Sequence, residues 1–138
     1  MSRFHWTANV FALAVFVSVA PAAFGQEQPV KRTELLRAPL EAAEGKEIVV
    51  FTAEYAPGAA SARHSHPGQE VIYIVEGALT LEPDNPDKAP GGTLKAGETA
   101  LNPGNEVHIG KNASTSERML ALVVVIADEG KPLAVEAK

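Results

Sequence analysis

Residues 58–77, GAASARHSHPGQEVIYIVEG, decide the fold expected of this chain. Within them, His64 and His66 are two positions apart, and Glu70 follows four positions after His66. Because every second side chain of an extended strand points to the same face, these three side chains are expected together. Two imidazoles and a carboxylate on one face suit a borderline divalent cation, and His108 is available as a fourth ligand. The sequence therefore predicts a metal site inside a small β-barrel.

The spacing of glycines and candidate ligands resembles the first signature motif of the cupin superfamily. Five residues separate Gly58 from His64, three separate His66 from Glu70, and six separate Glu70 from Gly77. An H-x-H pair alone is weak evidence, because a single strand histidine is more often an ordinary core or surface residue. The two glycines at turn positions are what make this pattern specific.

A second, looser cupin motif follows the first. It consists of Gly97, Pro103 after five residues, His108 and then Asn112. One position departs from the family pattern, because Asn105 stands where a glycine is usual. Asn adopts left-handed backbone nearly as readily as Gly, so we expect the turn to form all the same.

The resemblance implies an all-β fold, the jelly-roll barrel of two antiparallel sheets found in cupins. It also implies that His64, His66, Glu70 and His108 surround one metal ion. Three nitrogens and one oxygen suit a divalent transition metal, namely Fe, Mn, Ni, Co, Cu or Zn, and the ligand set alone does not choose among them. The group that this chain resembles most is that of small, single-domain, bacterial-type cupins of the quercetinase-like kind.

Residues 1–25 are typical of a secretory signal peptide. Arg3 and His5 precede an apolar run at residues 10–20, VFALAVFVSVA, and small residues follow up to Gly25. The run is shorter than the roughly 20 residues that cross a bilayer, which favours a cleaved signal over a membrane anchor. We therefore expect cleavage near Gly25, no stable membrane insertion afterwards, and a periplasmic or secreted protein.

Composition limits the function further. The chain has 138 residues and no cysteine, which excludes disulfides and thiolate chemistry. Its formal net charge is −5, and removal of residues 1–25 takes away one Arg and no acid, which gives 11 − 17 = −6. An acidic chain without a basic cluster is a poor candidate for nucleic acid or anionic membranes. A small-molecule substrate or ligand is the expected partner.

Residues 26–138 are expected to form a single domain. An N-terminal arm at 26–46, with at most one short strand or turn, packs on the barrel at 47–127, and a tail at 128–138 is either mobile or a short edge strand. Short segments rich in β-branched residues and bounded by Gly and Pro predict the barrel strands. These expected strands are 47–55, 62–66, 70–75, 78–82, 98–101, 107–109 and 118–127, the last of them central.

The segments 70–75 and 118–127 are apolar on both faces, which favours burial between two sheets or at a subunit interface. Together with the small size of the chain, this pattern predicts a homodimer. Arg63 has the opposite strand parity to the ligands and is expected to face away from them. Asn112 begins a glycosylation-like sequence, Asn-Ala-Ser, and is interpreted as a turn residue. Packing or surface roles are expected for Glu54, Tyr55, Gln69 and Tyr73.

Three functions are compatible with such a site. The first is a metal-dependent dioxygenase of the quercetinase-like type, acting on a small oxygen-rich molecule. The second is an isomerase or lyase in which the metal is only a Lewis acid. The third is a non-enzymatic module that binds a sugar or metabolite. The full set of four ligands favours the two enzymes, and the fold alone does not choose among the three functions.

Overall fold

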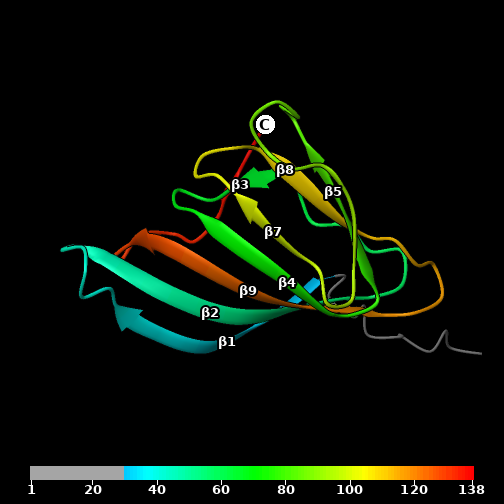
Figure 1. Cartoon of the computed structure of the whole chain (residues 1–138), viewed down its shortest axis with the longest axis horizontal. Coiled ribbons are helices and arrows are strands. Elements are labelled where there is room, and N and C mark those ends of the chain that lie inside the picture. The colour runs from blue at the N-terminus through cyan, green and yellow to red at the C-terminus, as the bar shows by residue number, and fades with distance from the viewer. Residues whose placement is uncertain (1–29) are drawn as a thin grey trace, which may run out of the picture.

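The computed structural model describes residues 30–138, which form two five-stranded antiparallel sheets (Figure 1). The first sheet has the strand order β1-β2-β9-β4-β7, and the second has the order β10-β3-β8-β5-β6. The all-β prediction of a cupin jelly roll is confirmed. The strands are β1 (Val30–Pro39), β2 (Lys46–Tyr55), β3 (His64–Ser65), β4 (Glu70–Glu76), β5 (Ala78–Pro83), β6 (Gly92–Lys95), β7 (Thr99–Asn102), β8 (His108–Asn112), β9 (Met119–Asp128) and β10 (Val135–Glu136).

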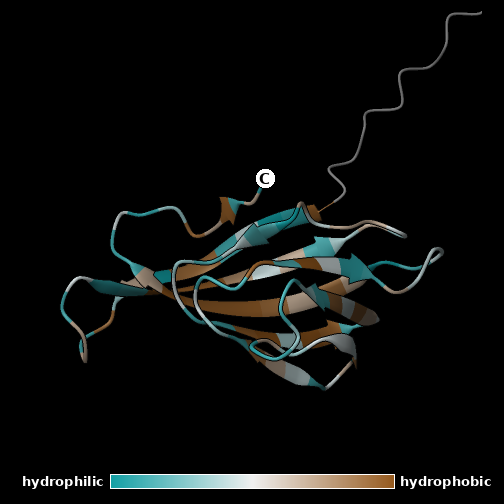
Figure 2. Ribbon diagram, turned by 90° about the horizontal axis from the view of Figure 1, so that it is seen from above, coloured by the Kyte–Doolittle hydropathy of each residue, from teal (hydrophilic) through white to brown (hydrophobic). Residues whose placement is uncertain are grey.

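Alternation of buried and partly exposed residues along β2 and β9 builds the core between the sheets. Every second side chain of these strands points inward, and Val49, Met119 and Val125 are completely buried. Figure 2 shows hydrophobic residues concentrated in the middle strands and hydrophilic residues in the loops around them. The prediction that 118–127 is a central strand is confirmed, because β9 lies between β2 and β4.

The expected N-terminal arm is the part of the fold that the sequence predicts least well. The expectation of at most one short strand was wrong, because β1 runs for 10 residues and pairs along the whole of β2. A bulge at Leu35 shifts the register between Glu34 and Leu36, and beyond it Arg37 forms an ion pair with the buried carboxylate of Glu47. Pro39 ends the strand at the sheet edge, where a missing N–H is tolerated.

Strand β4 is buried on one face only in the single chain. Ile72 and Ile74 point into the core, whereas Val71, Tyr73 and Val75 are 41%, 45% and 43% exposed. Residues 30–138 therefore do not bury the outer face of β4. The apolar side chains on this face stay partly exposed.

The C-terminal tail returns to the second sheet. Of the two alternatives for residues 128–138, the edge strand is confirmed, because β10 pairs with β3 through Val135–Ser65 and Glu136–His64. The tail thus lies against the strand that carries the first histidine. Nothing within residues 30–138 is a helix long and apolar enough to cross a membrane, and the expected signal peptide at 1–25 lies outside the described residues.

Candidate metal centre

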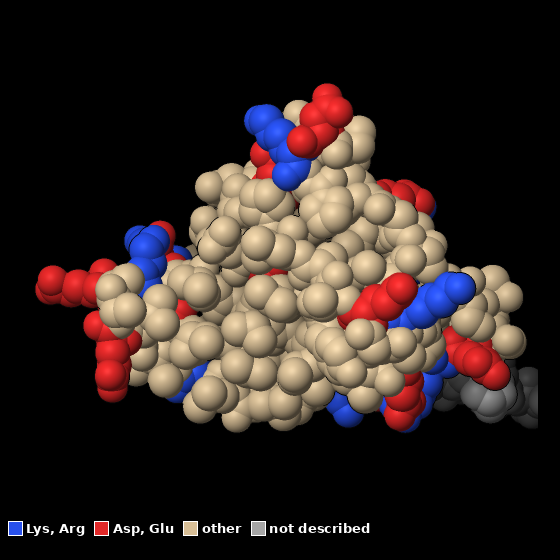
Figure 3. Space-filling model, viewed as in Figure 1, with Lys and Arg blue, Asp and Glu red and all other residues tan. Residues whose placement is uncertain are grey.

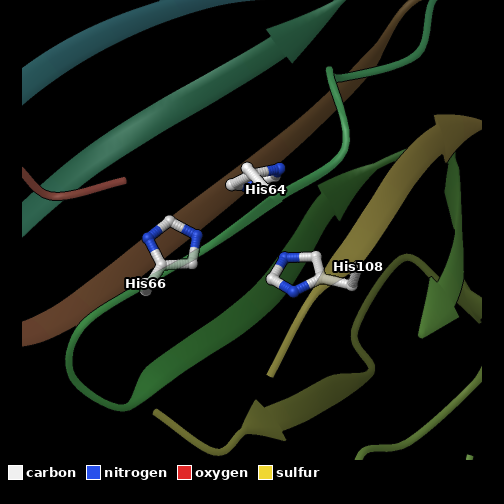
Figure 4. Close-up of side chains that lie close together, drawn as sticks. All are labelled: His64, His66 and His108. Carbon is white, nitrogen blue, oxygen red and sulfur yellow. The ribbon is translucent and has the colours of Figure 1, made fainter. Parts of the chain in front are cut away.

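The four predicted ligands come from three strands and one loop. His64 opens β3, His66 follows that strand, Glu70 opens β4 and His108 opens β8. His64 and His108 are direct partners in the pairing of β3 with β8. All four side chains are buried, with exposed fractions of 4–7%. Figure 4 shows the three imidazole rings pointing toward one another from these separate segments.

The distances between the ligand atoms fit a single ion. One nitrogen from each histidine lies within 4.8 Å of the others. The Oε1 of Glu70 is 3.1 Å from Nε2 of His66, and its Oε2 is 3.5 Å from Nε2 of His108. The structure brings the three histidines together around one point and places the carboxylate of Glu70 beside His66 and His108, and Glu70 as fourth ligand stays a prediction.

Each histidine turns its other nitrogen to a backbone carbonyl. Nδ1 lies 2.8 Å from the oxygen of Ala62 for His64, 2.6 Å from that of Leu133 for His66, and 3.2 Å from that of Glu106 for His108. A carbonyl oxygen can only accept, so Nδ1 carries the proton in each ring and donates it. This arrangement leaves the lone pair on Nε2 pointing inward, as metal-binding histidines require.

Glu70 is held by a neighbour that the sequence did not single out. Asn102, on β7, is the register partner of Glu70 and donates from Nδ2 to Oε2 at 2.8 Å. Its side chain is 2% exposed, and the bond fixes the plane of the carboxylate. Asn102 precedes Pro103 of the second motif, but only the pairing of β4 with β7 reveals its contact.

The environment of His66 tests whether a metal fits this site. Its Nε2 is buried and has no hydrogen-bond partner among residues 30–138. With Nδ1 donating to Leu133, the Nε2 lone pair faces the carboxylate oxygen of Glu70, which also only accepts. Two acceptors this close require a positive charge between them, either a proton or a metal ion. The residues therefore fit a divalent metal.

The pKa values of His66 and Glu70 reflect the same need for a positive charge between them. Burial alone would lower the pKa of His66, but the carboxylate of Glu70 beside Nε2 and the carbonyl of Leu133 together raise it. Burial alone would raise the pKa of Glu70, but His66, Asn102 and His108 together lower it. Both shifts favour a proton between His66 and Glu70 when no metal is bound.

His64 and His108 behave differently from His66. Burial lowers the pKa of His64 to about 4, and the neighbouring histidines add to the effect. Burial also lowers the pKa of His108, against the attraction of Glu70. Both rings are therefore neutral near pH 7, which is the form that binds metal.

The loop between His66 and Glu70 is fixed by two close approaches. A Cβ on Gly68 would lie 1.4 Å from the carbonyl oxygen of Ile126 in β9, so only glycine fits there. Asn105 donates its backbone N–H to the oxygen of His66 at 2.7 Å and has a φ of 64°. The prediction that Asn105 replaces the usual glycine in left-handed backbone is confirmed.

A cavity inside the barrel adjoins the metal centre. His64, Glu70 and His108 line it together with apolar side chains and the ring of Tyr55, and its volume of about 20 Å³ is close to that of one water molecule. Burial raises the pKa of Tyr55, which is therefore a neutral phenol at the cavity wall. Tyr55 thus belongs to the packed core, as expected, and also borders the site.

The expectations for Arg63, Glu54 and Asn112 hold in the structure. Arg63 points away from the site and pairs with Asp84, whereas Glu54 pairs with Arg118 on the surface. Asn112 is buried and donates to the carbonyls of Ala56 and Glu117, and its side-chain oxygen accepts from the N–H of Ser114. The turn interpretation of Asn112 is confirmed, because its amide is fully engaged.

A jelly roll in which three buried histidines lie close enough to hold one ion, with a buried carboxylate beside two of them, defines a β-barrel with a metal-binding site. The sequence family described as Cupin domain matches residues 51–125, and this chain belongs to that family. A search of curated proteins finds no match to the chain.

Solved structures resemble the chain in fold. A cupin-like protein from Thermotoga maritima has a TM-score of 0.60 and 21% identity, over 78% of this chain and 75% of that one. An oxalate oxidase in complex with the substrate analogue glycolate has a TM-score of 0.58 and 23% identity, over 78% of this chain and 54% of that one. The DMSP lyase DddQ from Ruegeria pomeroyi has a TM-score of 0.56 and 19% identity, over 65% of this chain and 43% of that one. The chain thus spans less than half the length of the DMSP lyases.

Proposed function

We propose that this protein is a metal-dependent enzyme of the dioxygenase type found in quercetinase-like cupins, acting on a small oxygen-rich molecule. The observation that carries the proposal is the convergence of three inward Nε2 atoms and the Glu70 carboxylate beside a cavity. Four protein ligands leave two positions of an octahedral ion free for substrate, water or dioxygen. A purely structural site would be closed instead.

The residues of the chain have separate tasks in this proposal. His64, His66, Glu70 and His108 hold the metal, which supplies Lewis acidity and, where it is redox-active, reactivity toward dioxygen. Asn102 orients the carboxylate through its hydrogen bond. Apolar side chains on the cavity wall, among them Phe51, Ile72 and Val123, keep water away from the inner side of the site.

Metal analysis and oxygen consumption test the proposal together. The protein is purified from its native compartment, its metals are measured, and oxygen uptake is followed with a panel of flavonols and other enolisable compounds. Uptake that disappears on chelation is expected. Turnover without oxygen uptake would instead point to an isomerase or lyase, and ligand binding that survives chelation without turnover to a binding module.

Export is part of the proposal. A basic start, a short apolar run and small residues support cleavage near Gly25 and a mature protein, residues 26–138, in the periplasm or outside the cell. Amino-terminal sequencing of the protein from these compartments tests this. A chain that starts at Met1 and stays with the membrane fraction would contradict it.

We also propose that the protein is a homodimer through the outer face of the first sheet. The support is the apolar side chains exposed there, namely Val71, Tyr73, Val75 and Leu101, of which Leu101 is 50% exposed. The surface over β2, β9 and β4 seen in Figure 3 carries few charged side chains, which gather around its rim. Sedimentation of the wild type and of Tyr73→Glu is the test, with Thr115→Glu in an exposed loop as control. A monomeric mass for the wild type would end this proposal.

A further inference from the structure

Arg32 directs a positive charge into the barrel from the edge of the first sheet. It is the register partner of Ala53, whose side chain is buried and points inward. Because directly opposite residues of an antiparallel pair point to the same face, Arg32 points inward too. Since β1 is the edge strand, this inward-pointing side chain lies at the open rim of the barrel and is exposed there.

Arg32 lines several hollows around the metal centre. Arg32 lines the inner cavity together with His64, Glu70 and His108. It also lines a hollow of about 270 Å³ that His64 borders and one of about 210 Å³ that His66 borders. A molecule that entered from either hollow to reach the ligands would therefore pass the guanidinium.

The guanidinium of Arg32 has no ion pair within residues 30–138. The other arginines of this range, Arg37, Arg63 and Arg118, each pair with a carboxylate. An inward-pointing cation at a cavity, left without a carboxylate, is available for an anion from solution.

The acidic residues nearest to Arg32 do not neutralise it. Glu34 shares the hollow beside His66, but its carboxylate accepts from Arg37. Glu136 shares the hollow beside His64 and forms no ion pair with Arg32. A divalent ion with Glu70 has a local charge of about +1, and Arg32 adds a second positive charge.

We propose that Arg32 anchors a carboxylate of the substrate, so that the site takes small organic acids. These acids carry a metal-binding oxygen at one end and a carboxylate at the other. The planar fork of a guanidinium matches the two oxygens of a carboxylate, which fixes the orientation of the molecule as well as its charge. This inference rests on the proposed metal-dependent function and narrows its substrate class.

Binding of diacids and their monoamides is the test. The protein is loaded with Ni²⁺, and malonate, succinate and glutarate are titrated calorimetrically beside the monoamide of each. The two members of a pair differ in one terminal charge. For at least one chain length, the wild type should bind the diacid about tenfold or more tightly than its monoamide, as a charged hydrogen bond predicts.

Matched variants assign the effect to Arg32. Arg32→Gln should abolish the preference, and Arg32→Lys should restore part of it. Lys31→Gln removes the same charge from the same strand but pairs in register with the outward Glu54, so the preference should remain.

Nickel content is measured for every variant, and it should be equal in the wild type, Arg32→Gln and Lys31→Gln. Full nickel occupancy without any diacid preference, or an equal loss of preference in Lys31→Gln, would overturn the inference and leave the metal site standing. A wild type that binds no metal would overturn both.

Discussion

Replacement of Gly68 by Ala should remove the metal site without touching a ligand. The new Cβ would lie 1.4 Å from the carbonyl oxygen of Ile126 and 2.6 Å from its carbon. Ordinary contacts between such atoms are roughly 3.5 Å, so the two backbones must separate by about 2 Å. The contact partner is backbone in the central strand β9, which has little freedom to move.

The displaced loop carries two ligands, His66 and Glu70, on either side of Gly68. Metal sites tolerate changes of about 0.2 Å in ligand distance, so a shift ten times larger should lower metal affinity by about 100-fold or more. The hydrogen bond from the N–H of Ile126 to the oxygen of Gln69, 3.0 Å long, would also be strained. Overpacking of this kind costs roughly 3 kcal/mol, which corresponds to about 10 °C in melting temperature.

Thermal melting in the presence of a chelator measures the stability of the metal-free fold, and metal titration by calorimetry measures the metal affinity. Gly58→Ala is the control, because its φ is +70° and a Cβ there meets nothing within 4 Å. This control should lose about 1 kcal/mol from backbone strain and bind metal normally. If Gly68→Ala had the same melting temperature as the control and kept wild-type metal affinity, the close approach to Ile126 would not position the ligands, and the reasoning would fail.

Three further outcomes are expected. His64→Ala and His108→Ala should each lose most of the bound metal in elemental analysis, whereas Arg63→Ala, which loses a surface pair with Asp84 and a hydrogen bond to the carbonyl of Lys138, should not. Asn102→Leu leaves Oε2 of Glu70 without its donor and should weaken metal binding about tenfold in the same titration, with the fold retained. In the metal-free protein, the pKa of His64 is about 4 in the folded state and 6.5 in the unfolded state, so its contribution to folding stability is complete above pH 6.5 and is lost toward pH 4. The lowered pKa values of His108 and Glu70 also make stability fall with pH, whereas the raised pKa of His66 opposes this trend. Denaturant unfolding should show lower stability at pH 4 than at pH 7, to which His64 alone contributes roughly 3 kcal/mol, and a flat profile would contradict the burial of His64.

The ligands could be predicted because local spacing determines them. His64, His66 and Glu70 lie within seven residues, and the short turn between β3 and β4 keeps them near one another, although the two strands belong to different sheets. The role of Asn105 was also local, since it depends only on backbone that Asn tolerates. The alternation of β2 and β9 is a property of each strand alone.

The missed features all depend on contacts between distant segments. Strand β1 was missed because its segment is rich in polar residues and is flanked by two prolines. Its stability comes from pairing with β2 and from the Arg37–Glu47 ion pair rather than from β-propensity. Gly68 resembles any turn glycine until β9 is placed against it. Nothing in the sequence indicates that the carbonyl of Leu133 orients His66.

The pairing of His66 with Glu70 explains how one scaffold can hold this site with or without a metal. The pair needs one positive charge between Nε2 and the carboxylate, and the raised pKa of His66 and the lowered pKa of Glu70 favour a proton there when no metal is bound. A metal ion that binds there must displace this proton, whereas His64 and His108 are already neutral. Metal affinity should therefore fall as the pH falls, because the raised pKa of His66 lets a proton compete for its Nε2 before the other two rings protonate. The buried carboxylate thus stabilises the metal-free fold and sets the pH range in which metal can enter it.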